Sequence, residues 1–259
     1  MKFQLLATFI DWLTENKEAY EPGPGLFCTA HIILMIAMFG MMVFLLFFAF
    51  KHPVFAKKLG AVMVITMASL RLLRMIIQVA SGYCSFGEAL PWQLCHFICF
   101  ALLVIYFIPS TKFSLPILSL AVLGGTMTFI FGDYYYINAA SFYMIESIFL
   151  HFALVGVTIC YIASRRPKYN WFSILQVPIF LGILCGWASI GNALYPGRNY
   201  MYIQKNVLPF NMFPGQHFFL SYLVIGLILL SIVAATYFII KAIKKRKQNN
   251  SAKNVEKSK

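Results

Sequence analysis

Hydrophobic residues in this chain gather in seven long runs that are separated by short polar segments. The runs cover approximately residues 30–50, 59–80, 89–108, 113–131, 142–163, 172–194 and 217–240. A helix needs about 20 apolar residues to cross the hydrocarbon core of a bilayer, and each run is close to that length. The pattern therefore predicts an all-α fold, a polytopic membrane helix bundle with seven transmembrane helices.

The basic residues between the runs alternate in number from one connection to the next. Lysines and arginines follow the first, third, fifth and seventh runs: Lys51, Lys57, Lys58, Lys112, Arg165, Arg166, Lys168 and the C-terminal tail. The connections after the second and fourth runs have none, and the one after the sixth has Arg198 and Lys205. Cytoplasmic loops carry an excess of such residues. We therefore expect a multi-pass protein of the cell membrane, with the N-terminus outside and the C-terminus inside.

The two ends of the chain differ from the apolar middle. Residues 1–25 place Phe3, Leu6 and Ile10 at helical spacing before the sequence EPGPG, which predicts a short interfacial segment. Residues 26–241 form the predicted seven-helix transmembrane domain. Residues 242–259 are a basic cytoplasmic tail, for which we expect anionic lipids of the inner leaflet as partners.

Composition supports lipid as the surrounding solvent. The chain is 61% hydrophobic and 11% charged, whereas soluble domains have roughly a quarter charged residues. The net charge of +13 comes largely from loops and tail, so we expect membrane lipids and not nucleic acid as partners. The six cysteines show no zinc or disulfide-scaffold spacing. No cofactor or metal is predicted, although a disulfide between Cys28 and Cys84 stays open.

Costly polar residues interrupt the second run. Arg71, Arg74 and Gln78 are spaced three and four apart, so they share one face of a helix. An arginine at the centre of a membrane helix costs about 2.5–3.5 kcal/mol, so we expect this face to point into the bundle. The arginines could snorkel or tie helices together, with Glu146 as a partner. Alternatively, they could bind a phosphate or carboxylate head group.

The third run opens with LPWQLCHF, which contains Cys95 and His96, and the fifth run contains His151. The predicted topology puts Cys95 and His96 in the outer half of the bundle, and His151 deeper, towards the middle, at a compatible depth. Three interpretations stand side by side: a packed cysteine with a hydrogen-bonded histidine, a zinc or copper site, or nucleophilic catalysis. A catalytic cysteine needs a base or a positive neighbour, which His151 and the arginines could provide.

Further polar residues are expected near the same outer end. The loop at 195–215 is long, aromatic and rich in proline and glycine, so we expect it to fold back over the bundle. Asn199 and Tyr200 would then offer hydrogen bonds to a ligand. His31 and His217 open the first and last runs and are expected to be interfacial.

Several motifs together resemble one family. LPWQLCHF is similar to the LP-x-x-x-C signature of the YwaF-like bacterial integral membrane proteins. The match extends over about residues 26–240. The order of motifs along the chain is the one that this family shows: TAHI, RLLR, LPWQLCHF, the His151 segment and GRNYMYI. The family is distantly similar to transmembrane protein 164, an acyltransferase acting on ether phospholipids. The resemblance implies Cys95 as nucleophile and His151 as base.

Two functions from different classes follow. The first is an intramembrane cysteine-dependent acyltransferase or acyl hydrolase that acts on phospholipid, with Arg71, Arg74, Gln78, His96, Glu146, Asn199 and Tyr200 in substrate binding. The second is a non-catalytic membrane protein, such as a small transporter, a lipid-binding module or a subunit of a complex. Buried charges also mark transport paths, but the chain has no visible internal repeat.

Overall fold

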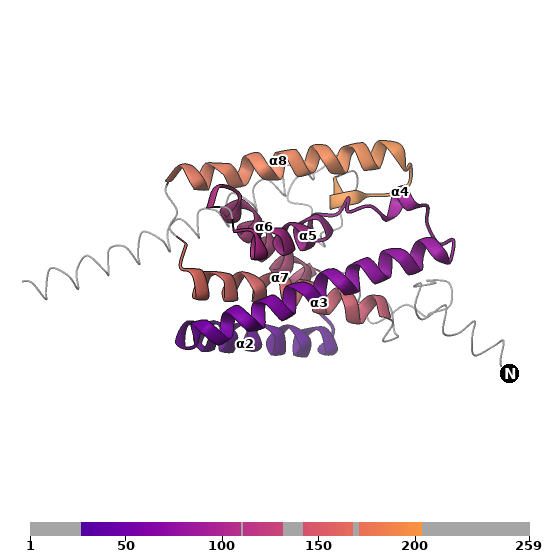
Figure 1. Ribbon diagram of the computed structural model, residues 1–259. Helices are drawn as coiled ribbons and strands as arrows, with labels where there is room; N and C mark the ends of the chain where they lie inside the picture. The colour runs from indigo at the N-terminus through magenta and orange to yellow at the C-terminus, as the bar shows by residue number, and fades with distance from the viewer. Residues whose placement is uncertain (1–26, 110, 132–141, 168–170, 204–259) are drawn as a thin grey trace, which may run out of the picture. The chain divides into compact units, whose positions relative to one another are not determined.

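The computed structural model describes residues 27–109, 111–131, 142–167 and 171–203 (Figure 1). In these ranges every regular element is helical, which confirms the all-α class for this part of the chain: α2 (Thr29–Lys51), α3 (Pro53–Ala80), α4 (Phe86–Ala89), α5 (Leu94–Phe107), α6 (Thr111–Phe131), α7 (Phe142–Arg165), α8 (Trp171–Leu194) and the 3-10 turn η3 (Tyr200–Tyr202). The helices belong to the first of two compact units, Met1–Met201 and Tyr202–Lys259. The segment 1–25, the run 217–240 with His217, and the basic tail lie outside the described residues.

Five of the described helices are long and apolar enough to cross a membrane. They correspond to the first, second, fourth, fifth and sixth predicted runs: Thr29–Lys51, Pro53–Ala80, Phe113–Phe131, Phe142–Arg165 and Ile174–Leu194. The third run yields a shorter apolar helix, α5, of 14 residues. At a rise of 1.5 Å per residue, α5 spans about 21 Å, which is less than the ~30 Å hydrocarbon core.

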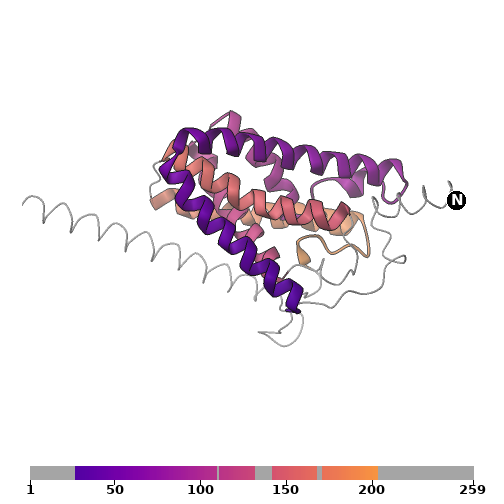
Figure 2. The ribbon, with the colours of Figure 1, turned by 90° about the horizontal axis from the view of Figure 1, so that it is seen from below.

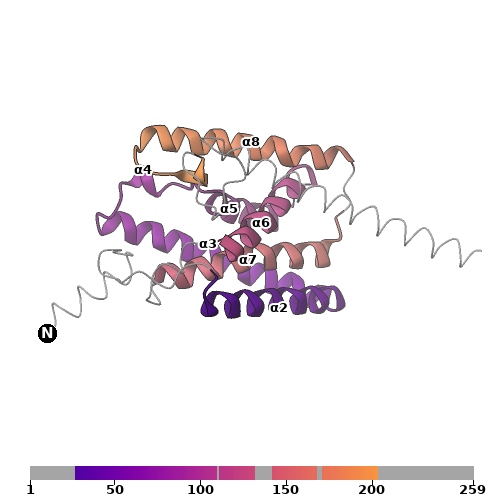
Figure 3. The same ribbon diagram turned by 180° about the vertical axis from the view of Figure 1, so that it is seen from behind.

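Helix α7 is the centre of the described helices. It packs against α2, α3, α5 and α6, and 67% of its most apolar stretch is buried. The corresponding fractions for α2 and α8 are 22% and 17%. Figures 1 and 3 show α2 and α8 on opposite sides of α5, α6 and α7. Residues on α7 are therefore the ones that can meet side chains from most of the other helices.

The outward faces of the peripheral helices are apolar. Phe44 and Phe47 on α2 are 68% and 72% exposed, and Ile179 and Ile183 on α8 are 64% and 62% exposed. Figure 2 shows α2 along its length, beside α3 and α7. Soluble monomers rarely expose contiguous apolar surface of this extent. Lipid is therefore the environment that these helices fit.

The start of α5 corrects the prediction that the third helix begins near residue 89. Helix α4 ends at Ala89, and Leu90 is extended with φ −56° and ψ 158°. Pro91 accounts for this break, because a proline disfavours the helical conformation in the residue before it and has no N–H to donate. Helix α5 begins at Leu94 with Gln93 as its N-cap. Cys95 and His96 consequently lie in the first turn of a helix and not in its middle.

His31, in the first turn of α2, is held through both of its ring nitrogens. Its side chain is fully buried (0% exposed). The Nδ1 atom accepts a hydrogen bond from the Phe27 N–H at 2.8 Å, and Nε2 lies 2.9 Å from the Phe129 carbonyl. Because a carbonyl can only accept, Nε2 carries the proton and the ring is neutral. His31 therefore ties the start of α2 to the end of α6.

Close packing of α6 on α7 yields a prediction for two adjacent glycines. A Cβ at Gly125 would lie 2.7 Å from the His151 carbonyl oxygen and 2.7 Å from Val155 Cγ2, whereas one at Gly124 would lie 3.6 Å from its nearest neighbour, Leu94 Cδ2. Gly125→Ala is expected to lower the free energy of unfolding by about 1–3 kcal/mol, because the helices must move apart. Gly124→Ala, the matched control, is expected to be neutral or slightly stabilising. Thermal unfolding in detergent measures both, and equal melting temperatures would contradict the packing.

Candidate functional site

Helix α3 turns its polar face into the bundle. Arg71, Arg74 and Gln78 are 3%, 7% and 9% exposed, as their spacing predicted. The Arg74 Nη1 atom donates to Glu146 Oε2 at 2.8 Å. The Arg74 guanidinium also lies 3.7 Å from the centroid of the Tyr143 ring, a cation–π arrangement. The charge of Arg74 is therefore compensated by a carboxylate and an aromatic face, both from α7.

Arg71, one turn away, has different surroundings. Its Nε and Nη1 atoms are buried without a hydrogen-bond partner, and so is Oε1 of Glu146. Arg71 lies within electrostatic range of Arg74 and Glu146, and of Cys95 and Cys99 on α5. We call Arg71, Arg74 and Glu146 the charge cluster. Among the described residues it holds one positive charge in excess, because the carboxylate of Glu146 faces two guanidinium groups.

The first turn of α5 lies beside this cluster. Cys95 is half-buried and lies within electrostatic range of Arg71 and Glu146. Cys95 and His96 are the second and third residues of α5. The first N–H groups of a helix have no partner within the helix and carry partial positive charge. The helix N-terminus and Arg71 favour a negative charge at this position, while the burial of the thiol and the carboxylate of Glu146 oppose it.

The helices α5 and α7 each place one histidine in this region. His96 is half-buried and lies within electrostatic range of His151, Arg71 and Arg74. The Nδ1 atom of His151 lies 2.6 Å from the Ser147 carbonyl oxygen, one turn back on the same helix. A carbonyl accepts only, so Nδ1 carries the proton and Nε2 is the basic nitrogen. The structure thus places residues of α3, α5 and α7 within electrostatic range of one another, and the Ser147 carbonyl favours a proton on Nδ1 of His151.

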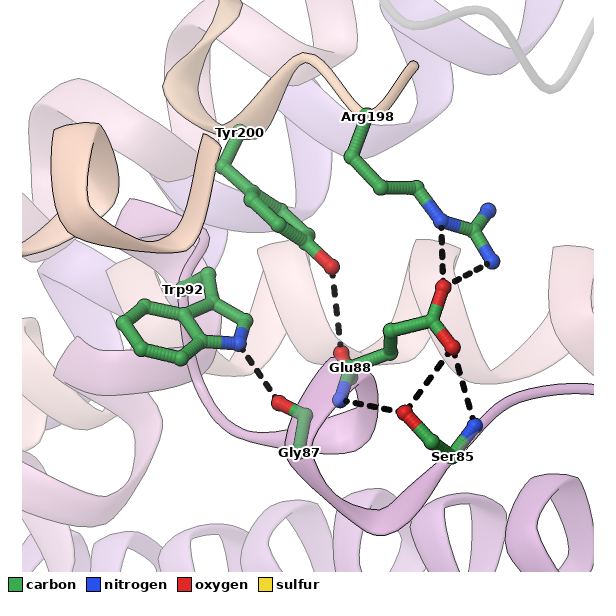
Figure 4. A network of polar contacts seen from close by, with 6 residues as sticks. All are labelled: Ser85, Gly87, Glu88, Trp92, Arg198 and Tyr200. Carbon is green, nitrogen blue, oxygen red and sulfur yellow. Dashed lines mark hydrogen bonds and ion pairs between the residues drawn. The ribbon is translucent and has the colours of Figure 1, made fainter. Parts of the chain in front are cut away.

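Next to these residues, two segments pack on one another; we call residues 85–92 and 195–201 the cap. Arg198 donates to Glu88 Oε1 through Nε at 3.1 Å and through Nη2 at 2.9 Å (Figure 4). Hydrogen bonds from the Ser85 backbone and then from Arg198 hold the pKa of Glu88 below its usual value. The Trp92 indole donates to the Gly87 carbonyl at 2.7 Å. The predicted fold-back of this loop is confirmed for its first residues, up to Met201.

The second half of the cap is fastened to α8 and to the start of α5. Asn192 and Tyr200 exchange two hydrogen bonds, of 3.1 and 2.7 Å. The Met201 N–H donates to Gln93 Oε1 at 2.8 Å, and Met201 has a left-handed φ of 52°. Gln93 caps α5 two residues before Cys95. The cap is therefore anchored directly to the turn that carries the cysteine.

Tyr200 lies within the cap and is hydrogen-bonded to it and to α8. It is 9% exposed, and its hydroxyl donates to the Glu88 carbonyl at 3.3 Å. Burial raises the pKa of its phenol to about 12. Its polar atoms hold the cap in place. Asn199, its neighbour, is half-buried.

The sequence places Trp92 on one helical face with Cys95, whereas the structure has it before the start of α5, in contacts that the sequence does not predict. Trp92 stacks on Trp187 with ring centroids 4.3 Å apart, and a Cβ at Gly191 would lie 2.6 Å from the Trp92 ring. Gly191 lies in the small-residue motif GWASIG, where the absence of a side chain leaves room for the Trp92 ring. The sequence did not single out Asn192 or Tyr143. No sequence pattern identifies Asn192 as a site residue. Its partner, Tyr200, lies outside α8, so helical spacing does not relate the two residues.

The described residues include no group of three or more histidine, cysteine, aspartate or glutamate side chains that could hold a metal ion. The six cysteines are all free thiols. Cys28 and Cys84 thus do not form the disulfide that the sequence left open.

Comparison with known proteins gives one match. No curated protein and no solved structure matches the chain. The family model described as the TMEM164 family matches residues 26–254. The match covers nearly all of the chain, including every residue of the charge cluster, the first turn of α5 and the cap. It supports the distant similarity to transmembrane protein 164, whereas the YwaF-like assignment stays a prediction. The apolar helices and this match together show that the chain is a membrane protein of the TMEM164 family.

Proposed function

We propose that this protein is an intramembrane acyltransferase that moves an acyl chain from a phospholipid through Cys95. The single observation that carries the proposal is the position of Cys95. Its thiol lies in the first turn of α5, half-buried, within electrostatic range of the charge cluster. A nucleophilic cysteine requires an electropositive environment, and a helix N-terminus beside an arginine provides one.

In the first step, the basic Nε2 of His151 removes the Cys95 thiol proton as the sulfur attacks the ester carbonyl of a lipid. The negative charge that develops on the carbonyl oxygen is stabilised by N–H groups in the first turn of α5. The C–O ester bond then breaks, and the leaving lysolipid alkoxide takes the proton back from His151. The acyl chain is left on Cys95 as a thioester.

The second step is the reverse of the first with a new acceptor. His151 removes a proton from the hydroxyl of a second lipid, whose oxygen attacks the thioester carbonyl. The Cys95 sulfur leaves and takes the proton from His151, so the protein returns to its starting state. Water as the acceptor would give hydrolysis in place of transfer.

The cysteine is tested with a thiol-reactive probe that carries a long alkyl chain. Cys28, Cys84 and Cys185 are half-buried like Cys95, so they serve as internal controls for access. We expect mass spectrometry to find Cys95 modified first, and His151→Ala to slow this modification by about 10²-fold, since the thiolate is the reactive form. Equal labelling of Cys185 and Cys95 would mean that modification follows exposure alone, and would favour a non-catalytic lipid-binding role.

We further infer seven spans, with the N-terminus outside, in the cell membrane. Lys51 and Lys57 lie at the junction of α2 and α3, and Arg165 and Arg166 lie at the end of α7. Successive spanning helices alternate in direction, so these basic residues belong to one side, which is the cytoplasmic side by the positive-inside rule. The first turn of α5 and the cap then belong to the outer side. The anionic lipid partner of the basic tail stays a prediction.

A further inference from the structure

We propose that Arg71 binds the anionic oxygens of a phosphate-bearing amphiphile, and that Arg74, one turn away, is structural. The proposal assigns different roles to two arginines that the sequence does not distinguish. It deepens the proposed function and rests on it for the lipid nature of the ligand. The binding itself does not require the thiol chemistry.

The two arginines differ in how their charge is balanced. Arg74 donates to Glu146 at 2.8 Å and lies over the ring of Tyr143. Arg71 is more deeply buried, 3% against 7% exposed, yet its Nε and Nη1 donors have no partner. Burial of a guanidinium without hydrogen-bond partners is strongly unfavourable. A protein that keeps such a group sacrifices stability, which is typical of a binding site.

The surroundings of Arg71 favour an oxyanion with an apolar tail as its partner. Arginine donors bind phosphate oxygens strongly, because both the donor and the acceptor are charged. Met67 and Ala68, in the turn before Arg71, belong to the apolar core of the bundle. The excess positive charge of the cluster matches a single negative charge, which is the charge of a phosphodiester.

The position relative to Cys95 fits a glycerophospholipid. Arg71 and Cys95 lie within electrostatic range of one another. In such a lipid, the phosphate and the acyl ester are separated only by the glycerol carbons. A phosphate bound by Arg71 would therefore bring an ester toward the first turn of α5. Arg71 is accordingly a substrate-binding residue that determines specificity for a phosphate-bearing lipid.

The test measures ligand-induced thermal stabilisation of the full-length protein, purified in the neutral detergent dodecyl maltoside. Dodecyl phosphate is the amphiphilic probe, and inorganic phosphate is the probe for a free anion. We expect dodecyl phosphate to raise the melting temperature of the wild-type protein, and Arg71→Gln to weaken its apparent affinity at least tenfold. Arg71→Lys, which keeps the charge but has fewer donors, is expected to fall between the two.

The control is the double variant Arg74→Gln/Glu146→Gln. It removes one positive and one negative charge together, so Arg71 keeps its excess charge and the affinity for dodecyl phosphate should stay close to that of the wild type. Without ligand, Arg71→Gln should be at least as stable as the wild type, since it removes a buried charge that lacks a partner. A lower melting temperature, or failure to fold, would identify Arg71 as structural and overturn the proposal.

Two further outcomes are decisive. Equal loss of affinity in the double variant and in Arg71→Gln would overturn the division between the two arginines. Equal stabilisation by inorganic phosphate and by dodecyl phosphate would overturn a lipid as the source of the anion. Cys95→Ser is expected to bind dodecyl phosphate like the wild type, so a failure of the acyl-transfer chemistry would not be mistaken for a failure of anion binding.

Discussion

Cys95→Ser is expected to lower acyl transfer between phospholipids by about 10⁴- to 10⁶-fold, the upper value being the scale of loss when a covalent nucleophile is removed. A hydroxyl in place of the thiol keeps the size of the side chain, but it is a far weaker acid and His151 cannot ionise it to the same extent. The measurement follows an isotopically labelled acyl chain from donor to acceptor lipid in proteoliposomes, by mass spectrometry. An unchanged melting temperature would show that the fold is intact.

Cys99 provides the matched control for this variant. It lies one turn further along α5, fully buried at 0% exposed, in the same core as Leu102 and Ile98. Cys99→Ala is expected to cost some stability and to leave the rate of transfer within a few-fold of the wild type. His151→Ala should lower the rate by about 10²- to 10⁴-fold, and His96→Ala by less, because the basic nitrogen is assigned to His151. Full activity in Cys95→Ala would contradict the mechanism and favour a non-catalytic protein.

Glu146→Gln is expected to lower the free energy of unfolding by about 3–5 kcal/mol, the usual cost of leaving one partner of a buried ion pair alone. Glu146 is 2% exposed and its partner Arg74 lies 2.8 Å away. The glutamine has nearly the same shape, so the loss reports the charge and not a cavity. After the substitution, Arg71 and Arg74 would repel one another without a carboxylate between them. Thermal unfolding in a neutral detergent provides the measurement.

Two comparisons give this prediction its controls. Adding Arg74→Gln to Glu146→Gln should restore most of the lost stability, since the pair is then removed as a unit. Glu88→Gln breaks a pair whose side chains are 42% (Arg198) and 23% (Glu88) exposed, and it should cost no more than about 1 kcal/mol. A Glu146→Gln protein as stable as Glu88→Gln would show that the charge cluster does not hold α3 on α7.

The sequence predicted the helices well because membrane insertion depends on local composition. Of the six apolar runs that lie within the described residues, five appear as helices long enough to span a bilayer. The exception is α5, which is shorter than predicted. Pro91 marks the break before this helix in the sequence, but the break lies inside a continuous apolar run and was therefore not predicted. The inward face of α3 was also predictable, since Arg71, Arg74 and Gln78 can avoid lipid only by sharing one buried stripe.

The sequence did not predict which polar residues of that stripe have an interaction partner in the folded protein. Arg71 and Arg74 have the same chemistry and lie one turn apart, so no local property distinguishes them. Only the position of Glu146, 72 residues further along the chain, assigns a partner to one and not to the other. The same applies to His31, whose partner Phe129 is 98 residues away.

The amino-acid sequence by itself therefore determined that the chain is a helical membrane protein and which face of α3 is polar, because apolar length and helical spacing are properties of contiguous residues. Tertiary structure alone decided three further features. Cys95 lies in the first turn of α5, Arg74 pairs with the carboxylate of Glu146, and two buried nitrogens of Arg71 have no partner. These features depend on distances between helices that are far apart along the chain, and the packing of α3, α5 and α7 sets those distances.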